Sequence, residues 1–313
     1  MPKITVIGSG NVGATAAINI AQKGLGDVVM IDIIEGIPQG KALDIQQSMP
    51  LWGSPSRVTG SNDFSSMSGS DIVVVTAGVP RKPGMTREDL LEVNAKIIRS
   101  VCAHIKEHAP DSIVIIVTNP LDSMTWLAFK ELGFPRERVM GMAGVLDSTR
   151  LRTLLSLELD VNPRDVETMV MGSHGDTMVS VLEQTRVKGR PVKELIPRER
   201  LDEIVEKTRN GGAEIVSHLK TGSAFYAPGA SITEMVEAML KDSGKVLPVS
   251  AYLEGEYGHS GIFLGVPARL GRKGMQEVLS LELGEDDRKA LDESARAIAK
   301  AIETLKSTQG MQD

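Results

Sequence analysis

A glycine-rich turn after a short β-branched run constrains the fold of this chain more than any other feature. Gly8, Gly10 and Gly13 follow the run 3–7 with the spacing G-x-G-x-x-G, and residues 14–21 then have the pattern of a good helix. Glycine allows a tight turn at the first position, close approach of a pyrophosphate at the second and close helix–strand packing at the third. The free N–H groups and dipole of the helix N-terminus favour an anion. The spacing therefore predicts a loop that binds a dinucleotide. The expected cofactor contacts are Gly8, Ser9, Gly10, Asn11, Val12 and Gly13.

A carboxylate ends the next buried run. Asp32 follows residues 28–31 and lies nineteen residues after Gly13, close to the interval of about twenty at which an acidic residue accepts hydrogen bonds from the ribose. A negative charge there also repels a 2′-phosphate, and the next residues are Ile33 and Ile34, with no Arg or Lys beside Asp32. These features favour NAD over NADP. The alternative is a surface aspartate that merely ends a strand.

Strand-like and helical segments alternate through the first half of the chain. The central strand-like runs are apolar throughout, as in a parallel sheet covered on both faces. We expect strands at 4–7, 28–31, 57–60, 72–76, 113–118 and 139–141, and helices that include 39–47, 87–107 and 123–132. This order predicts an α/β fold whose first domain, residues 1–145, is a Rossmann-type doubly wound parallel sheet.

The pattern changes beyond about residue 145. A helix at 148–158 is followed by alternating runs around 166–171 and 178–182, and a long helix begins near Arg198. We expect that helix to break near Thr221 and again at Pro228. Further strands at 246–252, 261–266 and 274–279 precede a closing helix at 286–305. Residues 146–313 are therefore expected to form an α+β substrate-binding and catalytic domain.

Composition and charge narrow the classes of partner. The chain has 35 basic and 41 acidic residues, a net charge of −6, which argues against nucleic acid because such proteins usually present a basic face. No apolar run approaches the ~18 residues of a membrane span, and the N-terminus enters a strand without a secretory signal. Cys102 is the only cysteine, so a reducing cytoplasm is the expected location.

Three residues of the second half form a candidate catalytic group. A dinucleotide loop together with a titratable base, a carboxylate and an arginine has the parts of a hydride-transfer enzyme. If such an enzyme oxidises an alcohol, it needs a base that works near neutral pH, and histidine titrates near ~6.5. His174 is such a base, and Asp147 could fix its tautomer and stabilise the imidazolium. Arg150 lies one helical turn after Asp147 and could grip a carboxylate through two parallel hydrogen bonds. The alternative for His174 is a histidine that caps a helix or loop.

The other four histidines are expected to be structural. They are His104, His108, His218 and His259. The first two lie four residues apart on an expected helix, but zinc sites usually need more than two ligands. With no third ligand evident, no metal is expected.

Taken together, these motifs resemble the lactate/malate dehydrogenase superfamily, and within it the malate dehydrogenases of the lactate-dehydrogenase-like type. The resemblance covers essentially the whole chain and rests on residues 8–13, Asp32 and the segments 76–87, 117–120, 144–150 and 172–176. It implies an NAD-dependent oxidoreductase that interconverts a 2-hydroxy acid and a 2-oxo acid by hydride transfer. His174 and Asp147 would be its acid–base pair, and Arg150 would hold the C1 carboxylate of the substrate.

The resemblance also assigns further site residues. Asn119 would contact both cofactor and substrate, and Val117, Thr118 and Asn94 would contact the cofactor. The segment 78–87, which by itself has the character of a solvated charged loop, would close over the substrate. Arg87 would then polarise the carbonyl oxygen. Arg81 stands where lactate dehydrogenases typically carry glutamine.

A second guanidinium at Arg81 suits a second carboxylate, so the expected substrates are malate and oxaloacetate, as in the tricarboxylic acid cycle. A lactate or broader 2-hydroxy-acid dehydrogenase is the nearest alternative, and a non-catalytic NAD-binding sensor or scaffold is a remote one. The resemblance and the amphipathic helices at 39–47 and 198–218 predict a homo-oligomer, with a tetramer favoured over a dimer.

Overall fold

The first half of the chain forms the expected parallel sheet. The computed structural model describes residues 1–80 and 84–309. Its parallel strands run in the order β3-β2-β1-β4-β5-β6, which is the doubly wound order of dinucleotide-binding folds. These strands are β1 (Lys3–Ile7), β2 (Asp27–Ile31), β3 (Val58–Ser61), β4 (Ile72–Val75), β5 (Ile113–Ile116) and β6 (Val139–Gly141). The sequence prediction of fold class is confirmed, because unbroken apolar runs form strands buried on both faces.

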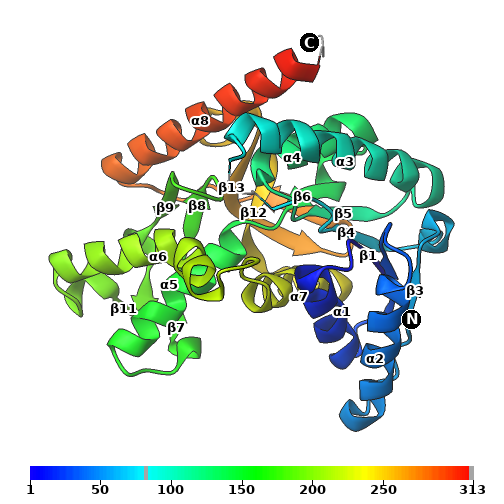
Figure 1. Ribbon diagram of the computed structural model, residues 1–313. Coiled ribbons are helices and arrows are strands. Elements are labelled where there is room, and N and C mark those ends of the chain that lie inside the picture. The colour runs from blue at the N-terminus through cyan, green and yellow to red at the C-terminus, as the bar shows by residue number, and fades with distance from the viewer. Residues whose placement is uncertain (81–83, 310–313) are drawn as a thin grey trace.

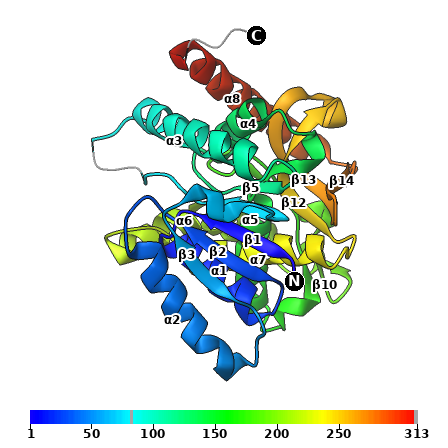
Figure 2. The ribbon, with the colours of Figure 1, turned by 90° about the vertical axis from the view of Figure 1, so that its right-hand side faces the viewer.

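Helices cover both faces of this sheet. In Figure 1, α3 and α4 lie above the sheet and α1 and α7 lie below it. Helix α2 packs beside the edge strand β3 (Figures 1 and 2). The α-helices described in the first half are α1 (Asn11–Gln22), α2 (Ile37–Trp52), α3 (Arg87–His108) and α4 (Leu121–Leu132). Within the described ranges, no helix is long and apolar enough to cross a membrane.

The second half extends the same sheet with antiparallel strands. Strand β12 (Val246–Glu254) pairs with β6 through Ser250 and Gly141, and the order continues β13-β8-β9. Strand β14 pairs with β13, while β7, β10 and β11 form a separate small sheet. The remaining strands are β13 (Ser260–Gly271), β14 (Gly274–Val278), β8 (Val170–Gly172), β9 (Met178–Ser180), β7 (Val166–Glu167), β10 (Arg186–Val187) and β11 (Arg190–Pro191).

Within residues 144–309, the structure describes four α-helices. They are α5 (Gly144–Glu158), α6 (Arg198–Leu219), α7 (Tyr226–Leu240) and α8 (Glu285–Gln309). Helix α5 packs on α6 over a second apolar core that includes Leu151, Leu155 and Val170. Because α5 begins at Gly144, the predicted boundary at residue 145 falls in its first turn; the division into two domains stays a prediction.

One expected helix break is wrong. The long helix does end near Thr221, at Leu219, and α7 begins at Tyr226. Pro228, however, lies inside the first turn of α7 and does not interrupt it. A proline there is tolerated, because the N–H groups of a first helical turn have no intrahelical partner to lose.

Candidate active site

The dinucleotide loop lies between β1 and α1. Gly8 adopts φ +96°, a left-handed conformation that favours glycine. A Cβ at Gly13 would lie 1.9 Å from the carbonyl oxygen of Gly8, whereas a Cβ at Gly10 would meet no atom within 4 Å. Gly13 therefore lets the helix approach the loop, and Gly10 faces open space.

The same loop fits the pyrophosphate of a dinucleotide. Helix α1 begins at Asn11, its N-cap Gly10 supplies no side-chain hydrogen bond, and its first turn contains no acidic residue. Its N–H groups are thus available to an anion. The Ser9 hydroxyl is buried without a hydrogen-bond partner in the described part of the chain. These features suit the pyrophosphate of NAD, and direct contact of residues 8–13 with it stays a prediction.

Asp32 lies directly against this loop. Its Oδ2 accepts a hydrogen bond from the Ser9 N–H at 2.7 Å, and its Oδ1 accepts one from the Ile34 N–H at 3.0 Å. No basic residue stands beside Asp32 in the sequence, but Lys41 lies near it in space: its Nζ donates to the Ser9 carbonyl oxygen at 2.6 Å. Lys41 comes from α2, and its charge is directed at the loop backbone.

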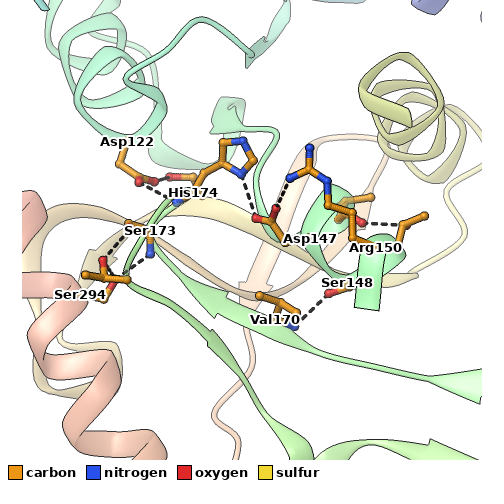
Figure 3. Close-up of polar contacts among 12 residues, drawn as sticks. Asp122, Asp147, Ser148, Arg150, Val170, Ser173, His174 and Ser294 are labelled. Carbon is orange, nitrogen blue, oxygen red and sulfur yellow. Dashed lines mark hydrogen bonds and ion pairs between the residues drawn. The ribbon is translucent and has the colours of Figure 1, made fainter. Parts of the chain in front are cut away.

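The three residues of the candidate catalytic group lie in contact with one another. His174 Nδ1 lies 2.8 Å from Asp147 Oδ2, and Arg150 Nη1 donates to Asp147 Oδ1 at 3.2 Å. Figure 3 shows the imidazole and the guanidinium on the same side of the Asp147 carboxylate. Only 2% of the Asp147 side chain is exposed. Since a carboxylate only accepts, Nδ1 carries the proton in neutral His174 and Nε2 is the free base.

The loop that carries His174 is held by side-chain hydrogen bonds. Strand β8 ends at Gly172, which adopts φ +83°. The Ser173 N–H donates to Ser294 Oγ of α8 at 2.7 Å, and the hydroxyls of Ser173 and Thr177 lie 2.7 Å apart (Figure 3). These contacts place the imidazole over the first turn of α5.

The electrostatics favour a protonated histidine. Burial disfavours the imidazolium, but the charge of the Asp147 carboxylate and its hydrogen bond outweigh that effect, so the pKa of His174 is raised above its usual value. Arg150 acts in the opposite direction and lowers the pKa of His174. The cluster can therefore take up and release a proton close to neutral pH.

Asn119 lies at the carboxyl end of β5, on the same sheet edge as the dinucleotide loop. It is exposed and lines the pocket beside His174. The predicted cofactor residue Asn94 is buried. Its side-chain amide accepts a hydrogen bond from the Val79 N–H and donates to the carbonyl oxygens of Val79 and Asn119. Thr118 donates to the Ala77 carbonyl oxygen, and Val117 is partly buried. Direct contact of Asn94, Val117 and Thr118 with cofactor stays a prediction.

The two arginines of the expected closing loop differ in what the structure shows. Arg81 lies outside the described residues. Arg87 is the first residue of α3, whose start is fixed by a reciprocal capping box between Thr86 and Asp89. Their contacts with substrate stay predictions.

Sequence reasoning missed a second carboxylate beside the histidine. Asp122 Oδ2 accepts the His174 backbone N–H at 3.2 Å, and Ser250 Oγ donates to its Oδ1 at 2.6 Å. Spacing gives no signal for this contact, because Asp122 is 52 residues from His174 and 128 from Ser250. The proximity of Asp122 to the predicted Asn119 was the only available hint.

A third potential metal ligand, which the sequence prediction did not include, lies beside two of the other histidines. A Glu107 carboxylate oxygen and the ring nitrogens of His104 and His108 lie within 4.8 Å of one another, so a third potential ligand does exist. The His104 ring also stacks on Phe64 at a centroid distance of 4.0 Å. This cluster occupies the C-terminal end of α3 and does not include His174.

Two protein-family models together match nearly the whole chain. The model described as lactate/malate dehydrogenase, NAD binding domain, matches residues 2–141, and that described as lactate/malate dehydrogenase, alpha/beta C-terminal domain, matches residues 144–309. A malate dehydrogenase of Roseiflexus sp. (strain RS-1) is 53% identical over 306 residues, which are 98% of this chain and 99% of that protein.

Solved structures agree with these matches. The malate dehydrogenase of Cryptosporidium parvum superposes with a TM-score of 0.95 at 46% identity, covering 98% of this chain and 99% of that one. The lactate dehydrogenase of Cryptosporidium parvum, complexed with lactic acid and nicotinamide adenine dinucleotide, gives a TM-score of 0.94 at 44% identity and covers 97% of this chain and 98% of that one. One fold therefore accommodates either substrate, and the choice depends on individual residues.

Proposed function

The chain belongs to the lactate/malate dehydrogenase family, and we propose that it catalyses the reversible NAD-dependent oxidation of (S)-malate to oxaloacetate. The observation that carries this proposal is the hydrogen-bonded group of His174, Asp147 and Arg150. This group lies at the sheet edge that also carries the dinucleotide loop. Asp122, two residues after Pro120, holds it there, because its carboxylate accepts a hydrogen bond from the His174 backbone N–H. We place the division between the cofactor domain and the catalytic domain at residues 145 and 146.

His174 is the acid–base group. Neutral His174 accepts the substrate hydroxyl proton at Nε2. NAD, held by residues 8–13 and Asp32, would supply the hydride acceptor for the carbon that bears this hydroxyl. Asp147 keeps the other ring nitrogen protonated and stabilises the imidazolium that forms. In the reverse direction the imidazolium donates its proton to the carbonyl oxygen of oxaloacetate. The raised pKa of His174 keeps a useful fraction of this acid available near neutral pH.

Arg150 holds the C1 carboxylate of the substrate. Its Nη1 is bonded to Asp147, but a guanidinium has five N–H donors in a planar fork, so donors remain for a two-point contact with a carboxylate. That contact fixes the C2 carbon, and such orientation can remove a large share of the activation barrier of a bimolecular reaction. Asn119 supplies a further hydrogen bond from the carboxyl end of β5.

Arg81 selects a dicarboxylic substrate. Its guanidinium pairs with the second carboxylate of malate or oxaloacetate, which lactate and pyruvate lack, and Arg87 polarises the reacting carbonyl. The resemblance in segment 76–87 supports these two assignments, and the name of the Roseiflexus relative agrees with them. A lactate or broader 2-hydroxy-acid dehydrogenase is the competing function, and it is supported by the similar fold of a lactate dehydrogenase.

The test is NADH absorbance decay with oxaloacetate and pyruvate in parallel. We expect oxaloacetate to be strongly preferred and His174→Asn to lower kcat by about 10²–10⁴-fold, with NADH binding retained. His218→Asn is a matched control, since His218 is exposed on α6. Equal use of pyruvate would support the broader enzyme, and NADH binding without turnover of either substrate would support a sensor or scaffold.

The chain also has a surface suited to self-association. Apolar side chains are exposed on α2 and on the segment that precedes it: Ile33, Ile34, Ile37, Leu43, Leu51 and Trp52. Exposed large apolar side chains gathered on one element are candidates for an interface. We place the protein in the cytoplasm as a homo-oligomer, a tetramer rather than a dimer. We also expect it to use NAD rather than NADP, because of Asp32.

A further inference from the structure

Asp122 is a buried carboxylate to which the acid–base mechanism assigns no role. It lies in the first turn of α4 and is 6% exposed. Its two oxygens have different partners: Ser250 Oγ of β12 donates to Oδ1 at 2.6 Å, and the His174 N–H donates to Oδ2 at 3.2 Å. Figure 3 shows Asp122 on the side of His174 opposite to Asp147 and Arg150. The histidine is thus flanked by two carboxylates from different helices.

When His174 is protonated, the charges of this cluster balance only if Asp122 is counted. Asp147 contacts both His174 and Arg150, so the Asp147–Arg150 pair is neutral before the histidine takes up a proton. Protonation of His174 then leaves two cations and one anion. An ionised Asp122 supplies the second anion. An unbalanced charge in a site with little water is costly, and a nearby opposite charge offsets that cost.

The other charged groups that face this pocket are better solvated. They are Glu88 of α3, Asp176 of the histidine loop and Lys300 of α8. All three are exposed, so solvent and salt screen their effect on the imidazole. Among the described residues lining this pocket, Asp122 is therefore the carboxylate placed to act on His174 from the side away from Asp147.

We propose that Asp122 is a positioning residue that holds the His174 backbone and serves as a second counter-ion for the His174 imidazolium. The inference rests on the proposed acid–base role of His174. It assigns a function to a charge whose burial is otherwise unfavourable, and it explains why α4, β12 and the histidine loop meet at one side chain.

The ionisation of Asp122 fits this role. Burial raises the pKa of Asp122 to about 6, although the Ser250 hydroxyl and the charge of His174 act to lower it. The side chain is therefore charged at neutral pH and loses its charge as the pH falls through about 6. In turn, the Asp122 charge raises the pKa of His174.

The decisive experiment is an NMR titration of the histidine ring protons in wild type and Asp122→Asn. The chain has five histidines, and His174→Asn assigns the relevant signal. Asparagine keeps the shape and both contacts: its oxygen can accept the His174 N–H, and the Ser250 hydroxyl can rotate to accept from its NH₂ group. We expect the pKa of His174 to fall, because the Asp122 charge raises it, while the other four histidines are unaffected.

A purely structural Asp122 would not move this titration. A folded Asp122→Asn whose His174 titrates within about 0.2 pH units of wild type would overturn the proposal, since removal of a counter-ion should lower the pKa of His174. Asp111→Asn, an exposed site in the turn before β5, is the matched control and should leave His174 unchanged. In kinetics, the inflection of kcat/KM against pH should move to lower pH with the NMR value.

A second variant keeps the proposal testable if Asp122→Asn does not fold. Ser250→Ala removes a donor to the carboxylate but leaves its charge, so the pKa of Asp122 rises. The small second step that Asp122 imposes on the His174 titration near pH 6 should then move upward, and an unmoved step would contradict the inference. The titration needs no substrate, so a wild type inactive on oxaloacetate would refute the proposed function without touching this result.

Discussion

Asp147→Asn tests the geometry of the acid–base cluster. In the wild type both carboxylate oxygens accept, one from His174 Nδ1 at 2.8 Å and one from Arg150 at 3.2 Å. An amide has one acceptor oxygen and one NH₂ group. If the NH₂ group faces His174, it stabilises the tautomer with Nε2 protonated, and the base is lost. If it faces Arg150, two donors meet and a guanidinium loses its buried counter-ion.

The magnitude follows from this loss. Removing one partner of a buried, hydrogen-bonded charge pair costs roughly 2–5 kcal/mol, which corresponds to a decrease of about 30- to several-thousand-fold in kcat/KM. The pKa of His174 should also fall, because the Asp147 carboxylate holds it above its usual value. The imidazolium needed for oxaloacetate reduction is then present only at lower pH, so the loss of activity with rising pH should begin at a lower pH than in wild type.

The assay is NADH absorbance with oxaloacetate, read as kcat and KM separately across pH. A tautomer change lowers kcat, whereas displacement of Arg150 raises KM. NADH binding, followed by fluorescence, should persist because residues 8–13 lie on a different element. Asp111→Asn is the control. Retention of more than about a third of wild-type kcat/KM would refute the reasoning, since it corresponds to less than ~1 kcal/mol.

Four further predictions concern substrate, cofactor, stability and assembly. Arg81→Gln should lower kcat/KM for oxaloacetate reduction by about 30- to several-thousand-fold and raise pyruvate reduction. Arg81→Lys should not restore full wild-type activity, because an ammonium lacks the planar two-point contact. If Arg81→Gln left the ratio of oxaloacetate to pyruvate reduction unchanged, the assignment of malate as substrate would lose its basis. NADH should give a far higher kcat/KM than NADPH, and Asp32→Asn should narrow the difference; equal values in wild type would end the role of Asp32. Asp122→Asn should stabilise the fold by roughly 2–3 kcal/mol at pH 7.5 but not at pH 4, because a carboxyl pKa raised to about 6 makes wild-type stability fall as the pH rises towards 6; melting curves at both pH values test this. Light scattering should show an oligomer, and a single species of monomer mass at micromolar concentration would contradict it.

Local spacing predicted the parts of the site that lie close together in sequence. The glycine loop, the carboxylate at the end of the second strand and the one-turn separation of Asp147 and Arg150 all appear in the structure where the sequence placed them. Strand positions in the first half were also predictable, since apolar runs of four or five residues form strands buried on both faces. Most of these signals depend only on residues within about one turn or one strand, and Asp32 was recognised by its interval of nineteen residues from Gly13.

Contacts between distant segments were not predictable in the same way. Lys41 reaches Ser9 from a different helix. Glu107 is a different case: it lies three residues after His104 on the same helix, a spacing that does indicate a shared face, and the sequence prediction overlooked it. The expected break at Pro228 failed for another reason. Proline interrupts a helix interior but suits its first turn, and the true N-terminus of α7 depends on tertiary packing.

The position of His174 shows why such contacts matter for function. Its loop follows a glycine with positive φ, so regular backbone pairing does not specify where the imidazole lies. Instead Ser294, Asp122 and Asp147 fix it from α8, α4 and α5. These helices come from both halves of the chain, so neither half alone could hold the base against a substrate. Substitutions at positions with no direct contact to substrate should therefore change the pH dependence of catalysis, and Ser250, which acts through Asp122, is the clearest example.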